Sequence, residues 1–116
     1  MRTSHTNGAS YMTAISSILS RLRDALQQHY GGRFERLVLY GSHARGDATA
    51  DSDIDVMVVL KSLIHPVQEI EQMGDMLTDL LLQHGALISV YPISETDFQA
   101  RKSPLLANVR EEGILV

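Results

Sequence analysis

The chain has 116 residues, of which 44% are hydrophobic, so we expect one domain with a modest core and no room for a second. Its formal net charge of −4 argues against general binding to nucleic acid, because phosphate backbones are held mainly by clustered lysine and arginine. The sequence contains no cysteine, which excludes disulfides and thiolate metal sites. Apolar runs of strand length and the lack of a signal peptide predict a cytoplasmic protein.

The first predicted elements are a leader, a helix and a strand. Residues 1–10 are small and polar without periodicity, which predicts a flexible leader before a domain over residues 11–116. From Tyr11 to His29 apolar residues recur at helical spacing and polar residues fill the other face, so we predict an amphipathic helix. The glycine pair at 31 and 32 ends this helix, and residues 33–40 form the first strand.

A second strand and a second long helix follow. In residues 53–60 acidic and apolar side chains alternate at first and are followed by an aliphatic run, which predicts the second strand. Pro66 lies near the start of a long amphipathic helix whose apolar residues are spaced by threes and fours as far as His84. Gly85 ends that helix.

The last part of the chain predicts one more strand and two shorter helices. Residues 86–91 form the third strand, which Pro92 interrupts, and Ser94 caps a short helix. Ser103 opens a final helix that runs to about Glu112. The order predicts an α/β (α+β) single domain, with a sheet of three or more strands covered by helices, although a doubly wound nucleotide-binding fold shares this order.

One stretch carries the chemistry, a polar loop between the first two strands. Gly41 lets the backbone turn sharply and Ser42 is a favoured helix N-cap, so the free N–H groups here favour a phosphate. Asp53 and Asp55 stand two residues apart in a strand, which puts both carboxylates on one face and their apolar neighbours in the core. Two carboxylates repel each other unless a cation joins them, and hard oxygen ligands suit Mg²⁺. The loop therefore predicts a phosphate site beside a metal site.

The same residues have simpler interpretations. Gly41 and Ser42 alone could form an ordinary strand-to-helix turn, and the two aspartates alone could be solvated or paired with basic side chains. Arg45 either pairs with Asp47 or Asp51 across the loop or donates its forked N–H groups to a phosphate oxygen.

Ser52 and the histidines carry weaker signals. Ser52 is suited to bracing the turn as well as to contacting a nucleotide. The five histidines show no metal-ligand spacing, and we expect them at the surface or in caps. His43 alone is close enough to the loop to be considered for chemistry.

The combined motif resembles that of the polymerase-β-type nucleotidyltransferase superfamily, in which Gly-Ser is followed after ten residues by Asp-x-Asp. Here residues 43–52 separate Gly41-Ser42 from Asp53-Ile54-Asp55. The closer resemblance is to the minimal nucleotidyltransferase (MNT) domain family, whose expanded motif is matched by Gly41-Ser42-His43-Ala44-Arg45-Gly46 and Ser52-Asp53-Ile54-Asp55. A weaker similarity covers the closing helix and the final Glu-Gly-aliphatic segment at residues 102–116.

The resemblance implies a fold and an activity. The fold is a single-domain polymerase-β-like nucleotidyltransferase, a small mixed sheet flanked by helices with the two motif strands adjacent. The implied activity is transfer of AMP from Mg-ATP to a tyrosine hydroxyl of a HEPN-domain toxin, with this chain as the antitoxin. Whether the chain forms a homo- or a hetero-oligomer stays open, and the short apolar runs predict no membrane partner. The implied catalytic and metal residues are Asp53 and Asp55, and the implied nucleotide-binding residues are Gly41, Ser42, Arg45 and Ser52.

One departure from the superfamily pattern leaves an alternative open. Active relatives carry a third carboxylate on a neighbouring strand, whereas the third strand here offers only Leu87 or Ser89 at that position. Glu95 and Asp97 follow the strand and are the nearest acids. The alternative is therefore a nucleotide-binding module of weak or no activity that neutralises its partner by direct binding. A transferase for small molecules is a more distant hypothesis, because no acceptor pocket is evident.

Overall fold

A computed structural model describes residues 5–63 and 65–116, with side chains described from residue 14 onward. A four-stranded sheet has the order β3-β2-β1-β4. Its strands are β1 (Phe34–Tyr40), β2 (Ile54–Leu60), β3 (Ile88–Ser94) and β4 (Ile114–Leu115). The helices are α1 (His5–Tyr30), a 3₁₀ turn (Gly31–Arg33), α2 (Ser42–Arg45), α3 (Pro66–Gln72), α4 (Gly74–His84), α5 (Glu95–Ala100) and α6 (Pro104–Glu112).

The sheet is mixed, as the resemblance implied. Strand β1 pairs with β2 in antiparallel fashion, and the polar loop connects the two strands directly. Strand β3 pairs with β2 in parallel, and β4 pairs with the other side of β1 in antiparallel fashion. The two motif strands are therefore neighbours at the centre of the sheet, which confirms that part of the prediction.

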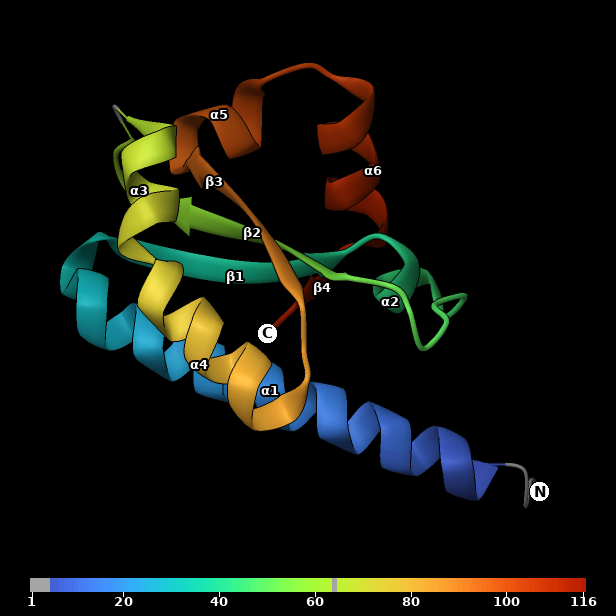
Figure 1. Ribbon diagram of the computed structural model, residues 1–116. Helices are drawn as coiled ribbons and strands as arrows, with labels where there is room; N and C mark the ends of the chain where they lie inside the picture. The colour runs from blue at the N-terminus through green and yellow to red at the C-terminus, as the bar shows by residue number, and fades with distance from the viewer. Residues whose placement is uncertain (1–4, 64) are drawn as a thin grey trace.

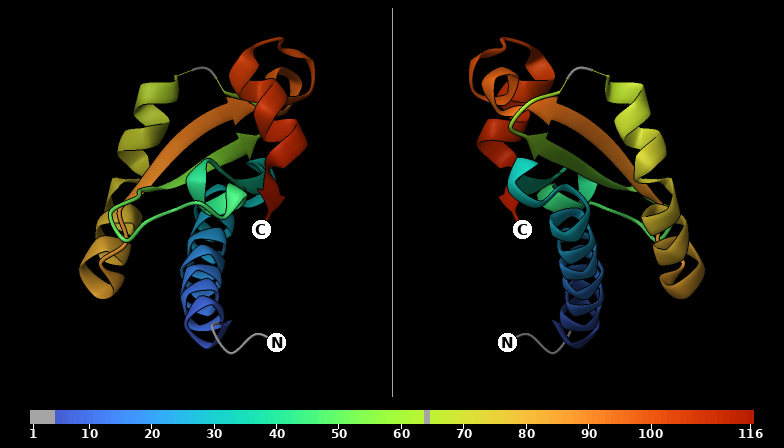
Figure 2. Two further views of the ribbon diagram at one scale, coloured as in Figure 1. Left: turned by 90° about the vertical axis from the view of Figure 1, so that its right-hand side faces the viewer. Right: turned by 90° about the vertical axis from the view of Figure 1, so that its left-hand side faces the viewer.

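Helices cover both faces of the sheet, so the central strands are buried on both sides. Figures 1 and 2 show α1 and α4 on one side and α5 and α6 on the other. Alternate residues of β2 divide between two apolar clusters, because successive side chains of a strand point to opposite faces. The first cluster includes Ile54, Val56, Val58 and Leu60, and the second includes Met57 and Val59. The predicted core residues of this strand are confirmed, and its other face is buried as well.

Two predicted helix limits differ from the structure. Helix α1 begins at His5, six residues before the predicted start, while residues 1–4 of the predicted leader lie outside the described residues. The division into a leader and a domain stays a prediction. The predicted long helix after Pro66 is instead two helices that meet at Met73, which is fully buried. Gly74 follows, and glycine has weak helix propensity, so the break falls where the helix is easiest to interrupt.

The third strand was predicted to stop before Pro92, but β3 continues through this proline to Ser94. Strand β3 lies at the edge of the sheet, so one of its sides has no neighbouring strand. Proline lacks an N–H group, and on that side no hydrogen bond between strands is lost. Strand β4 was not predicted as a strand, because two residues carry no usable periodicity.

The predicted caps are confirmed. The Ser94 hydroxyl accepts from the Asp97 N–H at 3.1 Å, and the Ser103 hydroxyl accepts from the Leu106 N–H at 3.1 Å. Gly85 ends α4 with a φ of 66°. Among the described residues, no helix has the length and apolarity needed to span a membrane.

Candidate functional site

Gly41 occupies a backbone conformation that only glycine adopts readily. Its φ is 76° and its ψ is −154°, a region that side chains with a Cβ essentially avoid. A Cβ at this position would also lie 2.5 Å from the Oδ2 atom of Asp55. Glycine is therefore required here for two reasons, and both bring the loop backbone close to the Asp55 carboxylate.

The segment after Gly41 forms a single compact helical turn. The N–H groups of Ala44 and Arg45 both donate to the Gly41 carbonyl, at 3.1 and 3.0 Å. The Gly46 N–H then donates to the Ser42 carbonyl at 3.0 Å, and Gly46 has a φ of 84°, which ends the turn. The loop backbone is thus held by its own hydrogen bonds beside the start of β2.

Asp55 is half-buried at the start of β2, between two neighbouring strands. Its register partners are Tyr40 on β1 and Ser89 on β3. Burial raises the pKa of the Asp55 carboxyl above its ordinary value, and repulsion from the nearby Asp53 raises it further. His43 and Arg45 act in the opposite direction.

The two aspartates fit a magnesium site because they place two negative carboxylates near each other. They stand at the start of one strand, Asp53 exposed and Asp55 half-buried, and their mutual repulsion is the kind that a divalent cation relieves. Among the described residues, however, no group of three acidic or imidazole side chains is placed to hold a metal. A magnesium ion bound here would therefore need oxygen ligands from a substrate, as is common where Mg²⁺ binds with phosphates.

A pocket of about 340 Å³ lies beside the loop and Asp55. One wall is the loop and the adjoining strand ends, and the other wall is a face of α6. Its lining consists of Tyr40, Gly41, Ser42, Arg45, Asp55, Leu105, Asn108, Val109 and Glu112. The structure thus brings together four of the six residues implied by the resemblance, with Asp53 two residues from Asp55 outside this lining.

Arg45 lines the pocket and also contacts the loop. Its Nε lies 3.3 Å from the Asp47 Oδ2, and both side chains are about half exposed or more, at 47% and 62%. An exposed ion pair of this kind contributes little stability, on the order of 0–1 kcal/mol. Arg45 can therefore leave Asp47 for a phosphate at small energetic cost.

Ser52 lies away from this pocket and braces the loop. Its hydroxyl accepts from the Thr49 N–H at 2.9 Å, and its carbonyl oxygen is 3.3 Å from the His43 Nε2. Ser52 and His43 together line a separate pocket of about 200 Å³ that reaches Ile15 on α1. His43 is only 7% exposed, so its predicted place at the surface was wrong, because it packs inward from the short α2 turn.

The acids after β3 lie at the wrong end of the sheet to complete the site. Ser89 is the β3 residue beside Asp55, and the six residue steps from there to Glu95 span about 20 Å of extended chain. Glu95 accepts two hydrogen bonds from Arg36 at 3.0 and 2.9 Å, while Asp97 pairs with Arg101 at 3.2 Å. Neither acid reaches the loop.

Glu112 is the carboxylate that sequence reasoning missed. It lines the pocket with Asp55 but comes from the last helix, 57 residues further along the chain (112 − 55). The usable signal was the spacing of Leu105, Asn108 and Glu112, which puts an apolar, an amide and an acidic side chain on one helical face.

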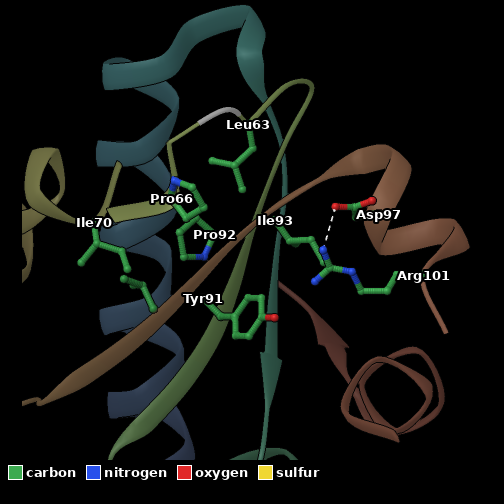
Figure 3. A pocket seen from close by; sticks show the side chains of 9 residues that line it. Leu63, Pro66, Ile70, Tyr91, Pro92, Ile93, Asp97 and Arg101 are labelled. Carbon is green, nitrogen blue, oxygen red and sulfur yellow. Dashed lines mark hydrogen bonds and ion pairs between the residues drawn. The ribbon is translucent and has the colours of Figure 1, made fainter. Parts of the chain in front are cut away.

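Another pocket, of about 430 Å³, is larger than the one beside the loop but remote from it (Figure 3). It lies between α3, β3 and α5, and its walls are mainly apolar, including Ile70, Tyr91 and Ile93. The Asp97 and Arg101 ion pair stands at its side. It holds neither aspartate of the motif, so size alone does not identify the candidate site.

Comparisons with known proteins agree on one family. A family model described as a nucleotidyltransferase domain matches residues 19–111. MJ0604 of Methanocaldococcus jannaschii, whose name proposes a protein adenylyltransferase, is 36% identical over 91 residues, covering 78% of this chain and 85% of the relative. MJ1305 of the same organism, with the same proposed activity, is 26% identical over 99 residues, covering 82% of this chain and 66% of the relative.

Solved structures with a similar fold include chains of toxin–antitoxin complexes. One is a crystal structure of a toxin–antitoxin with AMP-PNP, with a TM-score of 0.57 and 17% identity over 81% of this chain and 68% of that chain. Another is a double Asp-to-Glu mutant of the toxin–antitoxin MntA-HpeT, with a TM-score of 0.53 and 18% identity over 86% of this chain and 69% of that chain. At these identities the likeness concerns the fold alone.

Proposed function

This chain belongs to the nucleotidyltransferase domain family and is a nucleotidyltransferase, and we propose that it transfers AMP from ATP to a hydroxyl group of a partner protein. The observation that carries this proposal is the shared pocket of Gly41, Ser42 and Asp55. A loop suited to phosphate and a carboxylate suited to a magnesium ion open onto the same space. Phosphoryl transfer needs these two parts together.

The loop residues hold the triphosphate in this proposal. Because Gly41 lacks a side chain, the backbone can approach a phosphate closely, and Ser42 adds a hydroxyl donor beside it. Arg45 donates its guanidinium N–H groups to a phosphate oxygen once it leaves Asp47. Ser52 supports the loop from behind through its bond to Thr49 rather than contacting the nucleotide.

The two aspartates would hold Mg²⁺ together with the triphosphate oxygens. When bound, the metal ion supplies neutralisation of the negative charge that develops during transfer. The bond that forms joins the acceptor oxygen to the α-phosphorus, and the hydroxyl proton passes to water. The bond that breaks joins this phosphorus to the oxygen shared with the β-phosphate. Pyrophosphate leaves, and its β and γ phosphates are the ones that Gly41 and Ser42 position.

We further propose that the acceptor is a tyrosine hydroxyl of a HEPN-domain toxin and that this chain is its antitoxin. The family resemblance, the proposed protein adenylyltransferase activity of the relatives and the toxin–antitoxin origin of the fold neighbours all support this choice. The described part of the chain offers no second domain to hold an acceptor, so the partner would bring its hydroxyl to the pocket.

A second candidate function follows from one observation. Ser89, not a carboxylate, stands beside Asp55 on β3. A site with two acids can bind a nucleotide without transferring it efficiently, and the chain would then neutralise its partner by binding alone.

One experiment separates the two functions. The protein that co-purifies with this chain from its own cells is analysed by intact-mass spectrometry before and after incubation with ATP and Mg²⁺. Transfer predicts a mass gain in steps of one AMP that is absent with Asp53→Asn. A stable complex with a partner that was unmodified at the start and gains no mass would favour the binding function and overturn the transferase proposal.

A further inference from the structure

One face of α6 forms a wall of the candidate site. Leu105, Asn108, Val109 and Glu112 all line the pocket, and their spacing of three, four and seven residues from Leu105 puts them on one side of the helix. The opposite wall contains Gly41 and Ser42, the residues proposed to hold phosphates. No β3 residue lines this pocket among the described residues. The α6 face therefore shares one pocket with the loop and Asp55.

The structure holds this face in a fixed position. Leu106 and Val109 are 1% and 2% exposed and belong to the second apolar cluster, which anchors α6 on the sheet. A Cβ on Gly113 would meet the Val109 carbonyl and the Val38 side chain, so the helix end lies tightly against β1. Strand β4 then pairs Ile114 with Leu39. Glu112 precedes Ile114 by two residues, and Gly41 follows Leu39 by two residues. Because β4 and β1 run antiparallel, this pairing brings the end of α6 close to Gly41.

Glu112 has no evident structural reason for its place. A carboxylate in the last turn of a helix faces the negative end of the helix dipole, which is unfavourable. Glu112 forms no ion pair or side-chain hydrogen bond with another described residue that could offset this cost. Asn108 lies one turn earlier on the same face, with an amide group that can both donate and accept.

We propose that this face of α6 binds the nucleoside part of the donor nucleotide, a ribonucleoside triphosphate. Glu112 accepts hydrogen bonds from the ribose hydroxyls, Asn108 contacts the polar edge of the base and Leu105 packs against the base. A carboxylate is a favourable acceptor for paired sugar hydroxyls, as in dinucleotide-binding folds. The inference rests on the proposed function, because it takes the phosphates to lie against Gly41 and Ser42.

The test compares a ligand that has a nucleoside with one that lacks it. Binding of α,β-methylene-ATP, which cannot release pyrophosphate, and of inorganic tripolyphosphate is measured by titration calorimetry with Mg²⁺ present. The variants are Glu112→Ala and Asn108→Ala, and the matched control is Glu111→Ala, a neighbouring exposed acid of the same helix that does not line the pocket. Thermal unfolding of each variant checks that the fold persists.

We expect Glu112→Ala to weaken binding of α,β-methylene-ATP about tenfold, the usual effect of losing a hydrogen bond to a charged group. Asn108→Ala weakens the same ligand by a smaller factor. Tripolyphosphate binding stays unchanged or strengthens, since it has no ribose and loses a nearby negative charge. Glu111→Ala leaves the affinity for both ligands close to that of the unaltered chain.

Two results would overturn the inference, and the first of them leaves the proposed function standing. If the unaltered chain binds both ligands and Glu112→Ala changes neither affinity, or lowers both equally, the α6 assignment is wrong while the transferase proposal stands. If the unaltered chain binds neither ligand with Mg²⁺, both proposals fail. If the analogue result is as expected but no AMP transfer is found, the α6 assignment stands and the transferase proposal fails.

Discussion

Gly41 and Asp55 are packed so closely that a Cβ on the glycine would lie 2.5 Å from the Asp55 Oδ2 atom. This contact joins the two halves of the motif, since Gly41 directly follows β1 and Asp55 is the second residue of β2. The close approach is possible only because Gly41 has no side chain. The spacing between Gly-Ser and Asp-x-Asp in this chain therefore lets the loop return so that Gly41 contacts Asp55.

Gly41→Ala should destabilise the fold by about 1–3 kcal/mol, because alanine is strained at a φ of 76° and its methyl group would displace the Asp55 carboxylate. Urea unfolding followed by circular dichroism measures the change. Gly32→Ala is the matched control, because a Cβ there meets no atom within 4 Å. Equal stabilities for the two variants would show that the Gly41 contact is not the constraint that we infer.

Asp53→Asn and Asp55→Asn should each abolish AMP transfer while leaving partner binding largely intact. Each variant removes one negative oxygen from the proposed magnesium site without changing side-chain size. Intact-mass analysis measures transfer, and co-purification measures binding. Asp51→Asn, an exposed acid of the same loop that is not part of the Asp-x-Asp motif, is the control that should keep full activity. Normal transfer by both Asp53→Asn and Asp55→Asn would refute the catalytic role.

The sequence was sufficient to predict the parts of the site that lie close together in the chain. Gly41, Ser42 and Asp55 are separated by one loop, and the period-two pattern of the second strand determines which face carries the acids. The structure places these residues around one pocket, as the motif implied. Whether they bind nucleotide and metal stays a prediction.

The parts that were missed depend on contacts between distant segments. Pro92 was expected to stop a strand, because its tolerance depends on β3 being an edge strand, a property of the whole sheet. Glu112 was read only as the end of a helix, because nothing local shows that β4 pairs with β1 and brings that helix end to Gly41. The buried state of His43 likewise depends on where α2 packs against the rest of the fold.

The ionisation of Asp55 should lower the stability of the fold as the pH rises, which is the opposite of the usual effect of a folded aspartate. Because burial and Asp53 raise its pKa in the folded state, folded Asp55 binds a proton more tightly than unfolded Asp55. The ionised group therefore lowers stability at neutral pH, and this penalty fades as the pH falls through the raised pKa toward the unfolded value of 3.8.

Asp55→Asn tests this dependence by removing the charge. We expect the variant to be more stable than the unaltered chain at pH 7 in the absence of Mg²⁺, with the difference shrinking in acid. Urea unfolding at pH 7, 5 and 4 follows the difference, and added Mg²⁺ should reduce it at pH 7 by stabilising only the unaltered chain. A variant that is less stable at pH 7 would contradict the direction of the shift.

Glu69 should be important for stability but not for transfer. It is 8% exposed, and its carboxylate accepts from the Tyr30 hydroxyl at 3.1 Å and from the Arg33 guanidinium at 2.7 Å. Burial and then the Glu69 charge raise the pKa of Tyr30, so the phenol stays a donor at any ordinary pH. The three side chains connect the end of α1 to α3.

Glu69→Ala leaves both the buried phenol and the arginine without their acceptor, which should lower the free energy of unfolding by about 2–4 kcal/mol. Glu71→Ala, an exposed acid on the same helix, is the control and should change it by less than about 0.5 kcal/mol. Below the unfolding temperature both variants should transfer AMP at the rate of the unaltered chain, because the network lies outside the lining of the candidate pocket. A selective loss of transfer in a folded Glu69→Ala protein would instead show that α3 influences the geometry of the site.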